Sequence, residues 1–281
     1  MVILLALASA VCYALGTVLQ FNAANGVDRE WGLRLRLLGA LARDRRFLAG
    51  GALDLAGGVG QFFALKYGRV DVVLPALACG FPVAIAIDHK WNNDKMPPLE
   101  IAAIVAAAGS LAGFLAVRPA GGGAAFHGSY QRLAVGTVAA IAAGVVAIGV
   151  ARPFLRRVQI LGSLLGGLLL GYVAILERAV GLLWAHSGIC SVVTSWELYS
   201  LLAVGGIALV VVQSSFQGSV FRRAVSVVAV VEPISAVVLA AAVLGEPALG
   251  PDRALSGLLV VVAITSLAYL GYQERAERGR S

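Results

Sequence analysis

Two apolar runs joined by a short polar turn make up residues 224–272, which read AVSVVAVVEPISAVVLAAAVLGEPALGPDRALSGLLVVVAITSLAYLGY. Each run is long enough to cross the roughly 30 Å hydrocarbon core of a bilayer as a helix. The first run carries Glu232 directly before Pro233, deep inside the apolar stretch. A carboxylate at the middle of a membrane helix costs roughly 2.5–3.5 kcal/mol. We therefore expect Glu232 to face protein or water rather than lipid.

The same pattern occurs earlier in the chain, between residues 72 and 117. Phe81-Pro82 takes the place of the later acid–proline pair, and Pro82 lies thirteen positions before Lys95, as Pro233 lies before Glu246. The chain thus contains a degenerate internal repeat, and repeats of this length are typical of membrane transporters built from two related halves.

The composition agrees with a membrane protein. Hydrophobic residues make up 59% of the 281 residues and charged residues only 13%, against about 25% charged residues in an average soluble domain. The net charge of +7 comes from basic residues at the ends of apolar runs, where membrane topology places them, so we expect no nucleic-acid partner. The scattered cysteines and histidines indicate neither a disulfide framework nor a metal site. We predict an all-α polytopic membrane protein.

Nine membrane spans are predicted, with mostly short connections. Their boundaries are good to about two to four residues. They are Val2–Phe21, Phe47–Lys66, Val70–Asp88, Leu99–Val117, Leu133–Ala151, Gln159–Val180, Trp196–Gln213, Ala224–Leu244 and Ala254–Tyr272.

Arginines and leucines alternate in the connection after the first span, residues 25–46. This segment is either a simple basic loop or an amphipathic helix on the cytoplasmic face. If it is cytoplasmic, sixteen of the 22 basic residues lie inside and six, among them Arg178, lie outside. This bias predicts an outside N-terminus and a cytoplasmic C-terminus. The Ala-, Gly- and Arg-rich composition suggests a bacterial inner membrane.

With this topology the two halves of the chain start from opposite sides of the membrane. They become inverted four-helix repeats joined by a linking helix, and a substrate path between them is expected near the bilayer midplane. The predicted units are residues 1–118 for the first repeat, 119–158 for the linker and fifth helix, 159–273 for the second repeat, and 274–281 for a cytoplasmic tail.

The Glu232-Pro233 and Leu244-Gly245-Glu246-Pro247 pattern, its earlier echo, and Gly16-Thr17 in the first span resemble the drug/metabolite transporter superfamily of the EamA type. The nine-span layout with a basic connection after the first helix is most similar to its NIPA-like branch, whose members are described as magnesium transporters. The resemblance covers nearly the whole chain and implies a secondary carrier. One position departs from the small multidrug resistance proteins of this superfamily: Tyr13 stands where they carry a coupling glutamate.

Few polar side chains inside the spans are candidates for binding. The functional interpretation of Asp54 and Glu232 is an ion, proton or substrate site, and the structural one is a hydrogen bond between helices. Gln61 and Gln213 precede Pro82 and Pro233 by twenty-one and twenty positions, so the repeat relates them. They bind either a polar substrate or a neighbouring helix. Glu177 and Glu197, near outer span ends, fit either a gate or an interfacial charge.

The sequence therefore predicts a carrier that moves a small solute or metabolite by alternating access, with Asp54, Glu232, Gln61, Gln213 and Glu177 at its binding site. Because neither a nucleophile–base pair nor a Walker sequence occurs, we expect no enzymatic activity and no cofactor. The alternatives are a NIPA-like Mg²⁺ transporter, a lipid or lipid-linked carrier, and a non-transporting scaffold or subunit. A homodimer or a membrane partner protein stays open.

Overall fold

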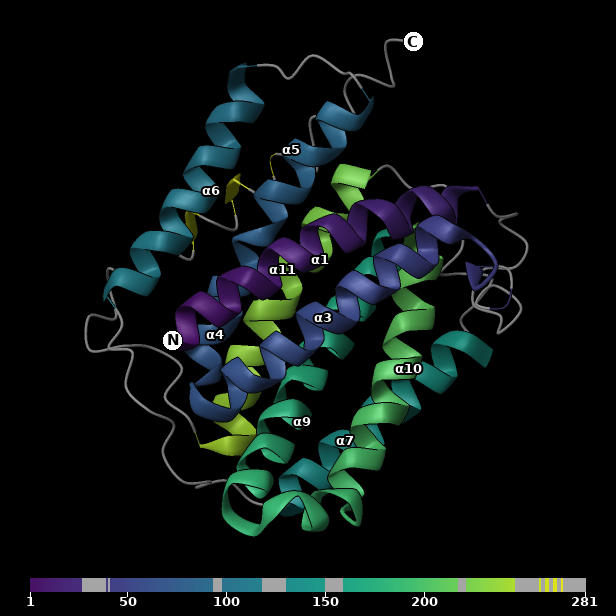
Figure 1. Cartoon of the computed structure of the whole chain (residues 1–281), viewed down its shortest axis with the longest axis vertical. Helices are drawn as coiled ribbons and strands as arrows, with labels where there is room; N and C mark the ends of the chain where they lie inside the picture. The colour runs from purple at the N-terminus through teal and green to yellow at the C-terminus, as the bar shows by residue number, and fades with distance from the viewer. Residues whose placement is uncertain are drawn as a thin grey trace.

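The described part of the protein is a bundle of α-helices, and no strand occurs among the described residues (Figure 1). The predicted all-α class is therefore confirmed. The computed structural model describes residues 1–26, 39, 41–92, 98–117, 130–149, 159–216 and 221–245, together with residues 258, 261, 262, 265, 266 and 269.

The helices agree with the predicted spans to within a few residues at most of their ends. In chain order they are α1 (Val2–Asn25), α3 (Arg45–Tyr67), α4 (Val70–Ala78), α5 (Gly80–Asn92), α6 (Pro98–Val117), α7 (Tyr130–Gly149), α9 (Gln159–Val193), α10 (Trp196–Phe216) and α11 (Phe221–Leu239), which continues into the π-helical segment η2 (Ala240–Leu244).

Seven segments of the described chain are long and apolar enough to cross a membrane. Large apolar side chains on their outer faces are exposed, as at Leu4, Leu55, Leu202 and Val238. A soluble monomer rarely exposes extended apolar surface, whereas hydrocarbon solvates it well. The protein is therefore a polytopic α-helical membrane protein. The seven segments are Val2–Ala24, Arg45–Tyr67, Val70–Trp91, Tyr130–Ile148, Leu161–Val193, Trp196–Phe216 and Val227–Leu244.

The count of nine spans stays a prediction. Helix α6 is not among the seven segments, and the ninth predicted span, Ala254–Tyr272, is described at six isolated positions only. Other predicted features lie outside the described residues. These are most of the basic segment 25–46, the Gly-rich connection 119–128, the tail 274–281, and the polar-turn residues Lys95 and Glu246.

The third predicted span, Val70–Asp88, is confirmed as an apolar segment long enough to cross a membrane, Val70–Trp91, but it consists of two helices, α4 and α5. It breaks at Cys79, whose N–H donates to a carbonyl oxygen only three residues back, at 3.3 Å. Pro82 has no N–H, so it adds no hydrogen bond to the helical ladder across this break. Helix α5 then starts at Gly80 against α1, where a Cβ would lie 2.5 Å from the Ala10 carbonyl oxygen.

The sixth predicted span, Gln159–Val180, is too short, because α9 continues to Val193. Glu177 and Arg178, which the prediction puts near the outer end of this span, lie well inside the helix. The helical backbone is interrupted only at Gly188, which has φ 78° and ψ 174°. The counting of Arg178 as an outside loop charge is therefore wrong.

Helix α11 ends in the π-helical segment η2, which Gly245 closes with a left-handed backbone (φ 71°). Arg132 at the start of α7 donates a hydrogen bond to the carbonyl oxygen of Ala242, at 2.8 Å. This bond supplies a donor to one of the carbonyl groups that a helix end leaves without an intrahelical partner.

Glycines let the central helices approach closely. Helix α1 lies along α3 (Figure 1), and a Cβ on Gly50 would lie 2.9 Å from the Gly16 carbonyl oxygen. On α9, Gly166 faces Val212 of α10, while Gly167 and Gly171 face α11. In a membrane such contacts replace the hydrophobic driving force, since packed backbones gain dispersion energy that lipid does not offer.

Helices α6 and α7 pack on different parts of the central bundle. Helix α6 packs on α4 and α5 and lies at one edge of the molecule, whereas α7 packs on α10, α9 and η2 (Figure 1). Helices α1, α3, α4, α5, α9, α10 and α11 therefore form the inner part of the bundle.

The Gly171→Ala substitution tests the close approach of α9 and α11. The new Cβ would collide with the Ser235 hydroxyl and lie 2.9 Å from the Glu232 carbonyl oxygen, so we expect destabilisation of roughly 1–3 kcal/mol by overpacking. Thermal unfolding of the detergent-purified protein measures it. Gly206→Ala on α10 is the control, because nothing lies within 4 Å of its Cβ position. Equal unfolding temperatures for the two variants would contradict the proposed contact.

Candidate functional site

A cavity of about 590 Å³ lies where seven helices meet, namely α1, α3, α4, α5, α9, α10 and α11. This volume is in the range of small-molecule sites, roughly 300–1,000 Å³. The walls are mostly apolar, and the polar lining is concentrated in a few side chains. These are Asp54, Glu177, Glu232, Gln20, Gln61, Gln213, Tyr13 and Thr17.

Asp54 lies in the interior of α3 and faces α1. The Gln20 amide donates a hydrogen bond from Nε2 to Asp54 Oδ2, at 2.5 Å. Room for the carboxyl group depends on Gly16, where a Cβ would collide with Asp54 Oδ1. Within the described part of the chain Oδ1 has no hydrogen-bond partner. The carboxyl group is thus held by one oxygen and keeps an acceptor on the other.

Gln213 extends this hydrogen bond to a third helix. Its Nε2 donates to Gln20 Oε1, so a continuous polar chain runs from α3 through α1 to α10. Gln213 is only 1% exposed, and its Oε1 has no hydrogen-bond partner among the residues that the structure describes. A buried amide oxygen without a donor is costly, and a donor from a bound molecule would satisfy it.

Gln61 and Glu177 make a second connection, between α3 and α9. Gln61 Nε2 donates to Glu177 Oε2 at 2.7 Å. Glu177 was predicted near an outer span end, where water is available, but it lies inside α9 and lines the cavity. The interpretation as an interfacial charge is therefore wrong for Glu177, because α9 continues to Val193 and does not end at Val180.

Glu232 and Pro233 line the cavity from α11. Glu177 of α9, Asp54 of α3 and Tyr13 of α1 line the same cavity. The Tyr13 ring lies against α3, since a Cβ on Gly57 would be 3.2 Å from it. Tyr13 therefore lines the cavity where α1 packs on α3.

All five predicted site residues line this one cavity. Their role in binding stays a prediction. The sequence predicted a shared site between the two repeats, but it did not predict how α3, α9, α10 and α11 bring these side chains together. Sequence reasoning missed Gln20. The signal was present, because Tyr13, Thr17 and Gln20 have the i, i+4, i+7 spacing of one helix face on an otherwise apolar span.

Arg178 is the largest fully buried side chain of the described core. Its guanidinium donates to the carbonyl oxygens of Leu65 and Lys66, at 2.6 and 3.3 Å. These carbonyls belong to the last turn of α3, where the helix has no N–H partner for them and carries partial negative charge. Arg178 thus caps α3 from α9, one residue beyond the cavity acid Glu177.

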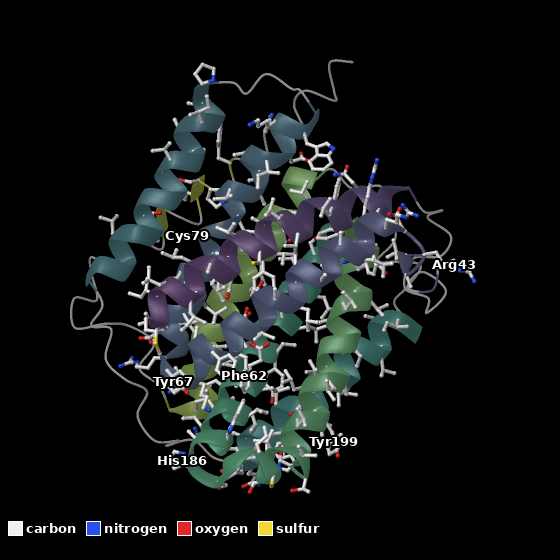
Figure 2. All side chains as sticks on the ribbon, viewed as in Figure 1. Arg43, Phe62, Tyr67, Cys79, His186 and Tyr199 are labelled. Atoms are coloured by element: carbon white, nitrogen blue, oxygen red, sulfur yellow. The ribbon has the colours of Figure 1, made fainter. Side chains whose placement is uncertain are left out.

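An aromatic cluster continues the contact between α3 and α9. The Lys66 ammonium lies 3.8 Å from the centroid of the Trp184 ring, and the Phe62 and Phe63 rings lie 5.7 and 5.9 Å from it. Figure 2 shows Phe62 and Tyr67 at the same end of the molecule as His186, far from Arg43 at the other end of α3. The C-terminal end of α3 is therefore firmly closed against α9.

Other polar residues take no part in the cavity. Glu197 is buried in the first turn of α10 and does not line it. Among the described residues, no three His, Cys, Asp or Glu side chains come together closely enough to hold a metal ion. Cys12, Cys79 and Cys190 are free thiols.

Comparison with known proteins places this membrane protein in a family. The chain is 30% identical over 253 residues to an uncharacterized protein of Corynebacterium glutamicum, and the match covers 87% of this chain and 84% of the relative. The chain therefore belongs to the same family as that corynebacterial protein. No family model and no solved structure matches the chain.

The Arg178→Met substitution tests the cap on α3. The variant leaves buried carbonyl groups without their donor, so we expect a loss of stability of roughly 1–3 kcal/mol. Thermal unfolding in detergent measures the loss. The matched control is Arg132→Met, because Arg132 is exposed and its bond goes to a helix end that water or headgroups reach. A cap role would be excluded by equal losses in the two variants.

Proposed function

We propose that the protein is a secondary carrier that binds a small solute in the central cavity and moves it across the membrane by alternating access. The observation that carries the proposal is the convergence of three acids and three amides on one cavity of about 590 Å³. Ionisable groups inside membrane spans are costly and mark substrate or ion pathways as a rule. A non-transporting scaffold has no need for such a cavity.

The chemistry of the lining indicates a cationic solute. Three carboxyl groups line the cavity, and none of the described lining residues is Lys, Arg or His. Asp54 Oδ1 and Gln213 Oε1 are acceptors without donors in the described part of the chain. A protonated amine supplies both positive charge and N–H donors, so it complements this site better than an anion or a neutral solute.

Helix contacts support the inverted-repeat hypothesis and the resemblance to the drug/metabolite transporters. Helix α1 packs on α3 as α9 packs on α10, and α1 packs on α4 and α5 as α9 packs on α11. Between the halves, α3 meets α9 as α10 meets α1, while α4 meets α11. A pseudo-two-fold axis that exchanges the halves would produce this pattern. The same hypothesis includes an inner-membrane location with the C-terminus in the cytoplasm.

A carrier for a lipid or lipid-linked molecule is a second candidate. Leu55 of α3 and Leu209 of α10 line the cavity, and they are 71% and 38% exposed. The cavity thus extends to the lipid-facing surface between these helices, and an amphiphile could enter from the bilayer. A Mg²⁺ carrier is a third reading, since hydrated Mg²⁺ needs only one or two carboxylates.

A ligand screen with the variants Asp54→Asn and Glu232→Gln tests the proposed function. At about 100 times its Kd, a ligand that binds only the folded protein stabilises it by about 2.7 kcal/mol. We expect n-butylammonium, but not n-butyrate, to raise the unfolding temperature of the wild-type protein, and we expect a smaller rise in both variants. Uptake of labelled n-butylammonium into proteoliposomes then measures transport.

The Glu197→Gln variant is the control, because Glu197 is buried but does not line the cavity. It should respond like the wild type. A response to Mg²⁺ alone would replace the amine carrier by the Mg²⁺ carrier, and a response to long-chain amphiphiles alone would favour the lipid carrier. If neither solutes nor lipids bind, the carrier proposal is refuted.

A further inference from the structure

Two carboxyl groups of the cavity are held at different levels along α3. Asp54 belongs to this helix, and Glu177 of α9 is hydrogen-bonded by Gln61 of the same helix, at 2.7 Å. Asp54 and Gln61 are seven positions apart, which is two helical turns, about 10 Å along the axis and nearly the same face. The two carboxyl groups therefore define two separate acidic levels in one cavity.

The first level, around Asp54, has more acceptors than donors. Gln20 satisfies one carboxylate oxygen, while Asp54 Oδ1 and Gln213 Oε1 have no partner among the described residues. Gln213 is only 1% exposed, so water from outside the cavity does not reach it. A group with several N–H donors would satisfy both oxygens.

The second level, around Glu177, is also rich in negative charge. Gln61 donates one hydrogen bond to Glu177, and Glu232 of α11 brings a further carboxyl group to the cavity. None of the described cavity-lining side chains brings a positive charge to either level. Each level thus lacks a cation of its own.

The described carboxyl groups do not gather around one point. Two levels about 10 Å apart along α3 are too far from each other for one compact dication to contact both. The cavity walls are apolar, as at Leu77, Phe81, Leu170 and Val173. A hydrocarbon chain is the group that such walls favour.

We propose that the cavity binds a linear organic dication, with one protonated amine at the Asp54 level, the other at the Glu177 level, and a hydrocarbon linker along the apolar wall. This inference rests on the proposed function and names its substrate class. Each methylene adds roughly 1.25 Å to an extended chain, as follows from standard bond lengths and angles. Charge-assisted N–H···O bonds span about 2.8 Å at each end. The expected ligand is a diamine of about three to seven carbons, depending on whether the end contacts lie along the chain or across it.

Isothermal titration of the purified full-length protein with α,ω-diamines of two to twelve carbons tests the proposal. The matched ligands are the monoamines of equal carbon number. We expect an affinity maximum within about three to seven carbons, where the diamine binds at least about tenfold more tightly than its monoamine, since each tenfold corresponds to one modest charge-assisted contact. Asp54→Asn and Glu177→Gln should each reduce the diamine to the affinity of the monoamine.

Glu197→Gln is again the control and should keep the length preference. Size-exclusion profiles and unfolding temperatures of the unliganded variants identify any that fail to fold, and for these Asp54→Glu and Glu177→Asp should shift the optimal chain length instead. Equal binding of monoamines and diamines, or affinity that rises steadily with carbon number, would refute the proposal of a dication ligand. The proposal of an amine carrier would not be affected. Absence of binding by every amine would overturn both.

Discussion

Every carboxyl and amide group in the interior of this bundle must find its partner within the protein, because hydrocarbon offers none. The structure meets most of this constraint with hydrogen bonds that cross between helices, and among the described residues it leaves Asp54 Oδ1 and Gln213 Oε1 without a donor. Asp54, Gln20 and Gln213 connect α3, α1 and α10, and Gln61 and Glu177 connect α3 and α9. The polar residues that hold the helices together are thus the same ones that line the cavity. Because the same side chains do both, we expect a ligand that contacts them to change how the helices pack.

The two ends of the cavity are closed to different degrees. At the C-terminal end of α3, Arg178 caps the helix and the ring of Trp184 stacks near Lys66 and two phenylalanines. Toward the other end, the amide chain between Gln20 and Gln213 and the edge contact of Phe21 with Phe216 join the halves. A carrier that works by alternating access needs one side to release while the other stays closed.

Several features of the site could be predicted from the sequence for clear physical reasons. The cost of burying a carboxylate in hydrocarbon identified Asp54 and Glu232, and the repeat identified Gln61 and Gln213. Gln20 was missed although its spacing with Tyr13 and Thr17 marks a polar helix face. Arg178 was misplaced because a charged pair usually ends a membrane span, whereas here the last carbonyls of a neighbouring helix supply its acceptors. The break at Cys79 also needed the structure, since proline tolerance in a membrane helix depends on what packs beside it.

By itself, the sequence determined the class of protein and the residue types at its centre. Apolar runs of about twenty residues leave no alternative to membrane helices, and the few acids within them have to face away from lipid. Only the tertiary structure decided which acid meets which amide, because these partners are 34, 116 and 193 positions apart in the chain and no local pattern encodes such pairs. It also decided that Asp54 and Glu177 occupy different levels of one cavity, since that arrangement follows from how α9 packs against α3.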